Sequence, residues 1–554
     1  MFKTLRLLAF LLFLPLLANA ATPPKAAIAS AHPLATRAGF EMLDKGGNAF
    51  DAAVAVAAVL AVVEPYASGL GGGGFWLLHD GKTGTNVMVD AREEAPGAAT
   101  RDMYLDSDGN VMREWATIGP AAAGIPGEPA ALAHMAERYG KLPLSVTLAP
   151  AIKYAEEGFP VDERYRKMAV NARDHLGRFP EARRVFLNQG DIPFAGHLLV
   201  QKDLAATLRA LAEKGRDGFY QGEVAKKLVD AVRTDGGIWS LDDLKHYKVV
   251  ERDPIVGQFR GAKIISAAPP SSGGVVMLET LGIIDEYQDG KFDPALLPHV
   301  LVEAWRRAYF DRARYLGDPD FVTMPIDGLL SYEYHIKMAD SITEDHATPS
   351  ALLGKVQEVK QGNDTTHLSV LDKDGNRVAA TLSINTAFGS GYMARGTGVL
   401  LNNEMDDFSA KPGASNVYGL VGNDANAIAP HKRPLSSMTP TFLEWNDKVA
   451  ILGTPGGSRI ISMVTLAVLD ALDGKPPQEW VSRPRYHQQY LPDVVEGEPA
   501  FVGSEAAKML MLRGDKVEST GRPYGNMQAI LWDQGSGAVE AASDPRGIGL
   551  ALVR

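Results

Sequence analysis

Hydroxyl side chains at the ends of two adjoining strands are the residues best placed to do chemistry. Two strand-like runs, THLSVL and RVAATLSI, flank a turn that contains Gly375, and together they predict a β-hairpin. Setting Val370 opposite Val378 keeps the apolar side chains on one face, whereas a slip of one residue mixes the two faces. This register places Thr365 opposite Ser383. Opposed Cβ atoms lie about 4.5–5.5 Å apart, so the two hydroxyl groups could share a hydrogen bond.

Thr365 needs a base before its hydroxyl group can act as a nucleophile, because a hydroxyl of ordinary pKa is a weak one. The α-amino group of a chain-terminal threonine provides such a base, with an ordinary pKa of about 7.7–8.0. Thr365 lies inside the chain, so this chemistry requires cleavage of the bond between Asp364 and Thr365. The polar stretch 344–364 is predicted to be a surface loop or linker, which is a suitable setting for that cleavage.

The segment PGGSR (455–459) could assist the same reaction. It is either a plain turn or a pair of backbone N–H donors at the start of an amphipathic helix that is opened by Ser458. Donors at such a position stabilise a developing oxyanion. His367, by contrast, is expected to be a structural histidine on the face of the sheet.

Acidic and hydroxyl side chains further along the chain could bind a charged ligand. Glu404, Asp406 and Asp407 could form a metal site, although no group of histidines accompanies them, or could hold an ammonium group. Ser436 and Ser437 are either a turn pair or hydrogen-bond donors to a carboxylate. Each signal alone is weak, so their joint occurrence is what has to be explained.

The elements that must position these residues begin with two helices, predicted within residues 26–64. The first ends at the glycine pair 46–47, and the second has Asn48 as its N-cap and is apolar nearly all round, which predicts burial. The four glycines at 71–74 lack the lysine of a phosphate-binding loop and the spacing of a dinucleotide fingerprint. Close backbone packing before a strand is therefore favoured there.

Helical and strand-like blocks follow one another along the rest of the chain. Residues 128–235 are mostly helical, and their charges are most simply explained as solvated faces without a chemical role. Strands are expected within 88–97 and within 250–275, and three more between residues 398 and 453. Helices are expected at 275–287, 301–317 and 458–474. Because helices come first and strands concentrate around Thr365, we expect helices covering a sheet of mixed or antiparallel character.

The first twenty residues have the pattern of a secretory signal peptide. Lys3 and Arg6 precede a short apolar run, and Ala18, Asn19 and Ala20 form a small-residue cleavage site. The apolar run of about 11 residues is shorter than the ~20 that a membrane-spanning helix needs, so an anchor is the weaker interpretation. We therefore expect export.

Composition narrows the classes of function. The chain of 554 residues contains no cysteine, which excludes disulfides, metal thiolates and a cysteine nucleophile. Its formal net charge of −11 argues against nucleic acid or anionic lipid as a partner. A hydrophobic content of 45% is ordinary for a soluble globular protein.

Several ordered blocks make the sequence resemble the γ-glutamyltransferase (γ-glutamyltranspeptidase) family of the N-terminal nucleophile hydrolases. They run from about residue 26 to 548 and include DTTHLSV, TLSINTAFGSG, LLNNEMDDFSAKPG, NVYGLVGNDANAI, KRPLSSMTPT and GTPGGSRII, with SGLGGGGF, DAREEAP, PPSSGG and YLGDPDF in addition. The resemblance implies an α+β fold, the four-layer αββα sandwich, made as one precursor. It implies a signal peptide, 1–20, and self-cleavage before Thr365 into a large subunit, 21–364, and a small catalytic subunit, 365–554.

The resemblance also gives roles to matching positions. Thr365 would be the nucleophile, and Ser383 its hydrogen-bond partner. Gly456 and Gly457 would form the oxyanion hole. The substrate α-carboxylate would be bound by Arg92, Ser436 and Ser437, and the α-ammonium group by Asn385, Glu404 and Asp407. The loop 412–423, with Tyr418, would be a lid over the substrate. A guanidinium suits a carboxylate, and paired carboxylates suit an ammonium group. No cofactor and no metal ion is implied.

The implied reaction is a two-step acyl transfer. Thr365 attacks the γ-glutamyl amide of glutathione or a related compound, and water, an amino acid or a dipeptide then takes the glutamyl group. The expected partners are these small molecules and the two subunits of one precursor, with no nucleic acid and no membrane anchor after signal cleavage. The expected location is the periplasm.

Two positions depart from the family pattern, and two alternatives stay open. Asp364 stands where many members have glutamine, which bears on the cleavage rate, and Ser383 replaces a threonine but keeps the hydroxyl group. One alternative is a related enzyme for another acyl group, such as a cephalosporin or glutaryl acylase or a capsule γ-polyglutamate transferase. The other is an exported binding protein that keeps the pocket and never matures.

Overall fold

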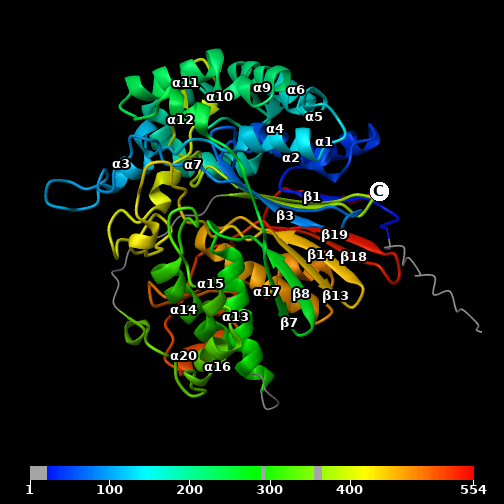
Figure 1. Cartoon of the computed structure of the whole chain (residues 1–554), viewed down its shortest axis with the longest axis vertical. Helices are drawn as coiled ribbons and strands as arrows, with labels where there is room; N and C mark the ends of the chain where they lie inside the picture. The colour runs from blue at the N-terminus through cyan, green and yellow to red at the C-terminus, as the bar shows by residue number, and fades with distance from the viewer. Residues whose placement is uncertain (1–21, 288–292, 355–364) are drawn as a thin grey trace, which may run out of the picture.

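Two β-sheets lie face to face at the centre of the protein, and helices cover the outer face of each (Figure 1). The structure is a computed structural model that describes residues 22–287, 293–354 and 365–554. Its layers are those of the αββα sandwich, so the predicted fold class is confirmed. The predicted signal peptide, 1–20, and the predicted cleavage site at Asp364 lie outside the described residues.

The first sheet combines strands from both ends of the chain. Its seven strands run in the order β20 (Leu550–Val553), β1 (Ala27–Ser30), β9 (Thr366–Leu371), β10 (Arg377–Ser383), β2 (Gly73–His79), β3 (Asn86–Ala91) and β6 (Val250–Arg252). All neighbours are antiparallel. The presence of β1 corrects the sequence prediction, which has only helices in residues 26–64. A run this short shows no alternation to recognise, and β1 is fixed by its partners β9 and β20.

The second sheet is also antiparallel and lies against the first. Its six strands run in the order β19 (Val539–Ser543), β18 (Gln528–Asp533), β14 (Lys448–Gly453), β13 (Thr441–Trp445), β8 (Ala262–Ser266) and β7 (Ile255–Phe259). A hydrophobic core between the sheets contains Leu77 and Ala379 from the first and Ile265, Phe442 and Trp532 from the second. Burial of such side chains is the main force that holds the layers together.

The predicted hairpin is formed by β9 and β10 in the predicted register. Val370 pairs with Val378, and Thr366 pairs with Leu382. The glycine run at 71–74 packs closely against the end of β10, as predicted. A Cβ atom at Gly72 would lie 2.0 Å from the carbonyl oxygen of Ser383. Only glycine therefore allows the segment before β2 to approach the end of β10 so closely.

One helical layer covers the first sheet. Its central helix, α2 (Ala49–Val63), is buried along its whole length, and Asn48 caps it by accepting hydrogen bonds from the N–H groups of Phe50 and Asp51. The other helices of this part of the chain are α1 (Pro33–Asp44), α3 (Arg113–Thr117), α4 (Glu128–Arg138), α5 (Leu144–Thr147), α6 (Ala149–Glu157), α7 (Glu163–Arg178), α8 (Pro180–Phe186), α9 (Lys202–Lys214), α10 (Asp217–Tyr220), α11 (Gly222–Thr234) and α12 (Leu241–His246). The predicted burial of α2 and the helical nature of 128–235 are confirmed.

A second helical layer covers the second sheet. It contains α13 (Gly273–Tyr287), α14 (Leu297–Tyr315), α15 (Ile326–Leu329), α16 (Tyr332–Asp340), α17 (Ile460–Leu472), α18 (Pro477–Ser482), α19 (Pro499–Val502) and α20 (Glu505–Leu512). The predicted helix start at Ser458 is wrong, because residues 457–459 form a 3₁₀ turn and α17 begins after it. α17 is also buried from Ile460 to Ala471 rather than amphipathic.

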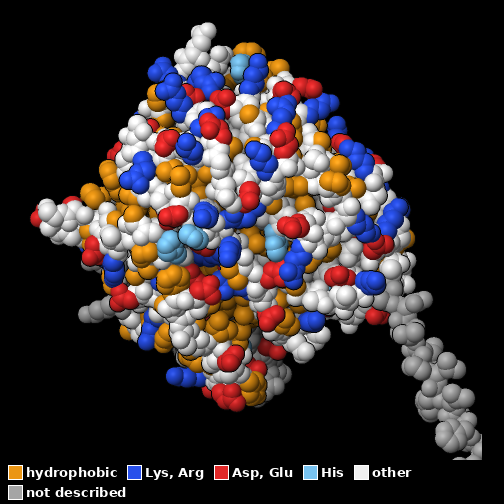
Figure 2. Space-filling view, turned by 45° about the horizontal axis from the view of Figure 1, so that its top comes forward, with side chains coloured by type: hydrophobic (Ala, Val, Ile, Leu, Met, Phe, Trp, Pro, Cys, Tyr) orange, Lys and Arg blue, Asp and Glu red, His pale blue; other side chains and the backbone are white. Residues whose placement is uncertain are grey.

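Short strands and the outer surface complete the fold. The short strands are β4 (Phe159–Pro160), β5 (Leu198–Leu199), β11 (Met393–Ala394), β12 (Val399–Leu400), β15 (Tyr486–His487), β16 (Val495–Gly497) and β17 (Val517–Ser519). Basic and acidic side chains are interspersed over the face seen in Figure 2. Within the described ranges, no helix has both the length and the apolar character needed to cross a membrane.

Candidate active site

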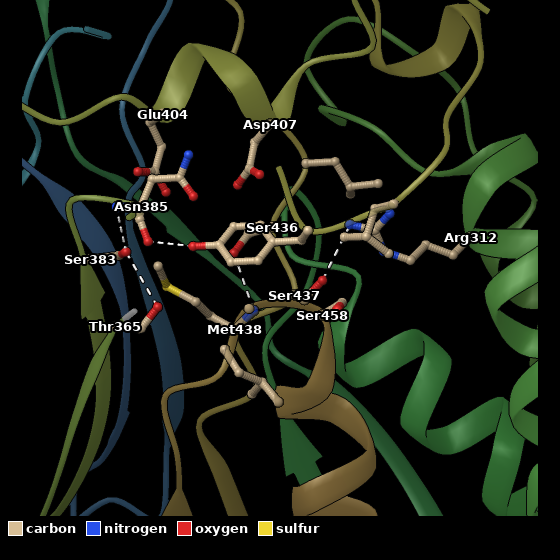
Figure 3. Close-up of a pocket in the computed structure, with 15 residues that line it drawn as sticks. Arg312, Thr365, Ser383, Asn385, Glu404, Asp407, Ser436, Ser437, Met438 and Ser458 are labelled. Carbon is tan, nitrogen blue, oxygen red and sulfur yellow. Dashed lines mark hydrogen bonds between the residues drawn. The ribbon is translucent and has the colours of Figure 1, made fainter. Parts of the chain in front are cut away.

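Thr365 lies directly before β9, and its hydroxyl group faces that of Ser383 at the end of β10 (Figure 3). The two oxygen atoms, Oγ1 of Thr365 and Oγ of Ser383, are 3.4 Å apart, and either can donate. The backbone N–H of Asn385 donates to the Ser383 hydroxyl at 2.7 Å. Both side chains are buried. The hydroxyl pair that the hairpin register predicts is thus present.

His367 is two residues further along β9 and is engaged within the sheet. Its Nδ1 lies 2.8 Å from the hydroxyl of Thr381, and its Nε2 lies 3.2 Å from that of Ser369. Burial lowers the pKa of His367 to about 3, so the ring is neutral. The interpretation of His367 as a structural histidine is confirmed.

A small pocket adjoins the hydroxyl pair. Its volume is about 20 Å³, which is room for about one water molecule. The predicted residues on its wall are Thr365, Ser383, Asn385, Glu404, Asp407, Tyr418, Ser436, Ser437 and Gly457, and those not predicted are Arg312, Leu420, Leu435, Met438, Ser458 and Ile460. Two predicted residues lie elsewhere: Gly456 lines a second cavity that also touches Thr365, and Arg92 lies behind the pocket wall.

Arg92 is fully buried behind the acidic pair that faces the pocket. Its Nη1 donates to the carboxylate of Glu404, and its Nη2 donates to Oδ2 of Asp407 at 2.5 Å. Nη1 is also 3.5 Å from the carboxylate of Glu93. One guanidinium thus contacts three carboxylates, and within the described residues no group of three or more histidine, aspartate or glutamate side chains is arranged to hold a metal ion. Direct contact between Arg92 and a substrate carboxylate stays a prediction.

The acidic side of the pocket has unusual titration behaviour. Burial raises the pKa of Glu404 to about 7, although Arg92 acts to lower it, and the charge of Asp407 adds to the rise. Burial likewise raises the pKa of Asp406 to about 7. Asp406 does not face the pocket, and its Oδ2 accepts a hydrogen bond of 2.6 Å from the N–H of Val417. Glu404, which lines the pocket, therefore changes charge near neutral pH.

Arg312, from α14, is the pocket cation that sequence reasoning did not find. Its Nε donates to the hydroxyl of Ser272 at 2.9 Å, and its Nη2 donates to that of Ser437 at 3.3 Å (Figure 3). Burial lowers the pKa of Arg312 to about 10, and it forms no ion pair with the described residues. In the sequence it is one of several arginines in a single helix, so only the fold distinguishes it.

The loop that carries Ser436 and Ser437 is held in place by the segment PPSSGG. The backbone N–H of Ser272 donates to the carbonyl of Ser436 at 2.8 Å, and the N–H of Ser436 donates to the carbonyl of Pro270 at 2.8 Å. These contacts fix both serines beside Arg312. This side of the pocket offers hydroxyl groups and a positive charge, which suit an anion.

Gly456 and Gly457 have backbone angles that favour glycine, with φ of +148° and +57°. A Cβ atom at Gly457 would lie 2.4 Å from the ring of Tyr418. The hydroxyl group of Tyr418 donates to the carbonyl of Asn385, and both residues line the pocket. The arrangement fits the predicted lid and a pair of N–H donors close to Thr365.

An αββα sandwich with a threonine at the head of a central strand defines the class of N-terminal nucleophile hydrolases. The solved structure of a cephalosporin acylase from Bacillus halodurans is similar over 100% of this chain and 99% of its own, with a TM-score of 0.84 and 28% identity. A chain of Helicobacter pylori γ-glutamyltranspeptidase has a TM-score of 0.56 and 41% identity, and the match covers 58% of this chain and 93% of that one.

This chain belongs to the γ-glutamyltranspeptidase family, whose model matches residues 35–553. The glutathione hydrolase proenzyme of Escherichia coli (strain K12) is 42% identical over 528 residues, which cover 94% of this chain and 90% of the relative. The glutathione hydrolase proenzyme of Bacillus subtilis (strain 168) is 38% identical over 548 residues, which cover 95% and 91%. The family resemblance is confirmed, and the chain is an enzyme of this family.

Proposed function

We propose that the protein transfers γ-glutamyl groups from glutathione and other γ-glutamyl compounds to water, amino acids or dipeptides. The observation that carries this proposal is the Thr365–Ser383 hydroxyl pair beside a pocket with opposite charges on its walls. Glu404 and Asp407 suit an α-ammonium group, and the serines beside Arg312 suit an α-carboxylate. The names of the relatives, glutathione hydrolase proenzymes, support the same substrate.

Maturation is part of the proposal. Cleavage between Asp364 and Thr365 would give a large subunit, 21–364, and a small subunit, 365–554, and would free the α-amino group of Thr365 as the base. That the relatives are named proenzymes supports such a step. Removal of a signal peptide, 1–20, and a periplasmic location complete this part of the proposal.

In the first chemical step, Oγ1 of Thr365 attacks the γ-carbonyl carbon and its proton passes to the α-amino group. The N–H groups of Gly456 and Gly457 stabilise the oxyanion, the C–N bond breaks, and the amine leaves with that proton. Water or an acceptor amine then attacks the ester, and Thr365 recovers its hydroxyl group. The substrate would be held by Asn385, Glu404 and Asp407 at the α-ammonium and by Arg92, Ser436 and Ser437, with Arg312 in addition, at the α-carboxylate.

A second candidate is an acylase for glutaryl or cephalosporin-type substrates. The similarity to the cephalosporin acylase favours it. A glutaryl group has no α-ammonium, however, so it would bring no cation to Glu404 and Asp407 beyond the one that Arg92 already supplies. The acidic pair is the observation that ranks γ-glutamyl transfer first.

Purified protein tested with γ-glutamyl and glutaryl 4-nitroanilides separates these candidates. We expect release from the γ-glutamyl anilide, a single band for Thr365→Ala on a denaturing gel with no release, and partial activity for Thr365→Ser. Release from the glutaryl anilide alone would establish the second candidate. A Thr365→Ala chain that still splits would contradict self-cleavage.

A further inference from the structure

A buried carboxyl group contacts the strand that follows the nucleophile. Glu64 caps the C-terminal end of α2, and its Oε2 accepts a hydrogen bond of 2.9 Å from the hydroxyl of Thr366. Its Oε1 accepts one of 2.9 Å from the hydroxyl of Tyr66. Thr366 is the first residue of β9 and directly follows Thr365. No step of the proposed acyl transfer uses Glu64, although its partner in this hydrogen bond is the neighbour of the residue that attacks.

Glu64 approaches β9 from the side opposite to the pocket. Successive side chains of a strand point to opposite faces of its sheet. The side chain of Thr365 faces Ser383 and the pocket, whereas that of Thr366 reaches the helical layer and Glu64. Leu368, two residues further on, belongs to the core that includes α2. Glu64 therefore holds the start of β9 from behind the nucleophile, where it does not compete with a substrate.

The surroundings of Glu64 support a negative charge. Burial raises its pKa, and four neighbours act to lower it: the positive charges of His32 and Arg164 and the hydrogen bonds from Tyr66 and Thr366. A carboxylate that accepts two hydrogen bonds and has cations nearby keeps its charge more easily than one in a purely apolar site.

This carboxylate is also close to the place where cleavage would create an amino group. Covalent geometry limits the path from the nitrogen of Thr365 through Thr366 to Glu64 to about 10 Å. Across such a separation, a charge shifts the pKa of a buried group by about one unit. The other charged groups around Thr365 and Glu64 in the described residues are Arg312, Glu404 and Asp407 at the pocket, Arg164, Lys167, Arg522 and Arg546 at the second cavity, and Asp162 beside His32.

The charges on the two sides of Thr365 act on that amino group in opposite directions. The charged side chains that line the second cavity are all cations, and they lower the pKa of an amino group at Thr365. The negative charge of Glu64 raises it. Glu64 is thus placed to keep this group basic while it is surrounded by arginine and lysine side chains.

We propose that Glu64 is a positioning residue for the nucleophile, which fixes the new chain end through Thr366 and keeps a negative charge beside its α-amino group. A chain end frays unless the residues next to it are held, and a hydrogen bond to a charged acceptor is stronger than one to a neutral acceptor. The amino group takes the proton of the Thr365 hydroxyl, so its pKa sets the pH range of the reaction. The inference rests on the proposed γ-glutamyl transfer and on cleavage before Thr365.

Glu64→Gln tests the role of the charge, because the amide keeps the shape of the side chain and can still accept from Thr366. Removal of a negative charge lowers the pKa of a nearby ammonium group. The rise of kcat with pH, measured with γ-glutamyl-4-nitroanilide, should therefore move to lower pH by about 0.5–1 unit. Labelling of Thr365 by an electrophilic γ-glutamyl analogue should show the same shift. Glu279→Gln, which changes a buried glutamate of α13 in the other helical layer, should leave both pH profiles unchanged.

Thr366→Val tests the anchor, because it removes the hydroxyl group and leaves Glu64 in place. Loss of a hydrogen bond to a carboxylate should lower kcat and the labelling rate about tenfold, whereas Thr366→Ser keeps the hydroxyl and most of the activity. Rates are taken per cleaved chain, counted on a denaturing gel.

Two results would overturn the inference and leave the proposed function intact. One is a pair of pH profiles for Glu64→Gln that coincide with those of the unaltered protein. The other is equal rates for Thr366→Val and Thr366→Ser. Failure of the unaltered protein to release nitroaniline would instead contradict the proposed function itself.

Discussion

Two buried arginines near the pocket differ in how their charge is compensated. Arg92 is shared among Glu93, Glu404 and Asp407, whereas the partners of Arg312 among the described residues are the hydroxyl groups of Ser272 and Ser437. A buried charge without an opposite charge is unfavourable unless a ligand supplies one. The charge of Arg92 is therefore balanced within the protein, whereas that of Arg312 is balanced by no described carboxylate.

Substitution of the two arginines by methionine should separate these roles. Arg92→Met leaves buried carboxylates uncompensated and should lower the free energy of unfolding by about 3–5 kcal/mol. Arg312→Met removes a cation that has no acidic partner, so stability should change by less than ~1 kcal/mol while the KM for a γ-glutamyl donor rises at least about tenfold. Chemical denaturation and donor kinetics of both variants provide the measurement. Similar losses of stability in the two would contradict the distinction.

Glu404 should make donor binding depend on pH. Burial, opposed by Arg92, raises its pKa to about 7, so it is protonated below that pH and charged above it. Only the charged form attracts the α-ammonium group, and the donor KM should therefore fall as pH rises from about 6 to about 8. Glu404→Gln should remove this pH dependence of KM. It should leave the pH dependence of kcat, which reflects titration of the α-amino group of Thr365. A KM profile of Glu404→Gln parallel to that of the unaltered protein would refute the assignment.

Among the elements, the loop 412–423 lies against the pocket, with Tyr418 and Leu420 on its wall. The N–H of Val417 donates to the carboxylate of Asp406, and the N–H of Tyr418 donates to the side chain of Asn416 at 2.9 Å. The hydroxyl group of Tyr418 donates to the carbonyl of Asn385. The space of about 20 Å³ that the loop leaves is too small for a glutamyl group. We therefore expect the loop to move before a donor enters.

Loss of one hydrogen bond should make this movement easier. Tyr418→Phe keeps the ring but removes the bond to the carbonyl of Asn385, a contribution of about 1 kcal/mol. We expect an electrophilic γ-glutamyl analogue to label Thr365 roughly fivefold faster and amides in 412–423 to exchange hydrogen faster. Tyr220→Phe, which removes a bond of 2.7 Å to Pro126 far along the chain, is the matched control. If Thr365 is labelled at the same rate in Tyr418→Phe, movement of the loop does not limit entry into the pocket.

The elements also show what the sequence can and cannot predict. The alternation of apolar and polar side chains predicted the register of β9 and β10, and a nearly continuous apolar stretch predicted the buried helix α2. Both are local patterns, so a single sequence reveals them. β1 was missed since its partners β9 and β20 lie hundreds of residues away. The charges of α7 were predicted to form a solvated face. Arg164 lines the second cavity, but nothing in the nearby sequence distinguishes it from the other arginines of that helix.

At the scale of the whole molecule, the two predicted subunits do not occupy separate halves. In the first sheet, β1 of the segment 21–364 lies between β20 and β9 of the segment 365–554, and β10 pairs with β2. In the second sheet, β13 pairs with β8. Neither segment can satisfy its backbone hydrogen bonds or cover its sheet faces alone.

Cleavage before Thr365 should therefore leave one folded body. We expect two bands on a denaturing gel but a single species with the full mass in native mass spectrometry, at the same mass as uncut Thr365→Ala. The segment 365–554 expressed alone should lack cooperative unfolding, because removing β1 and β2 exposes both edges of the hairpin that carries the nucleophile. Co-expression with 21–364 should restore folding to some extent. If the two mature segments separate in native buffer at micromolar concentration, the strand pairing between them contributes less to their association than expected.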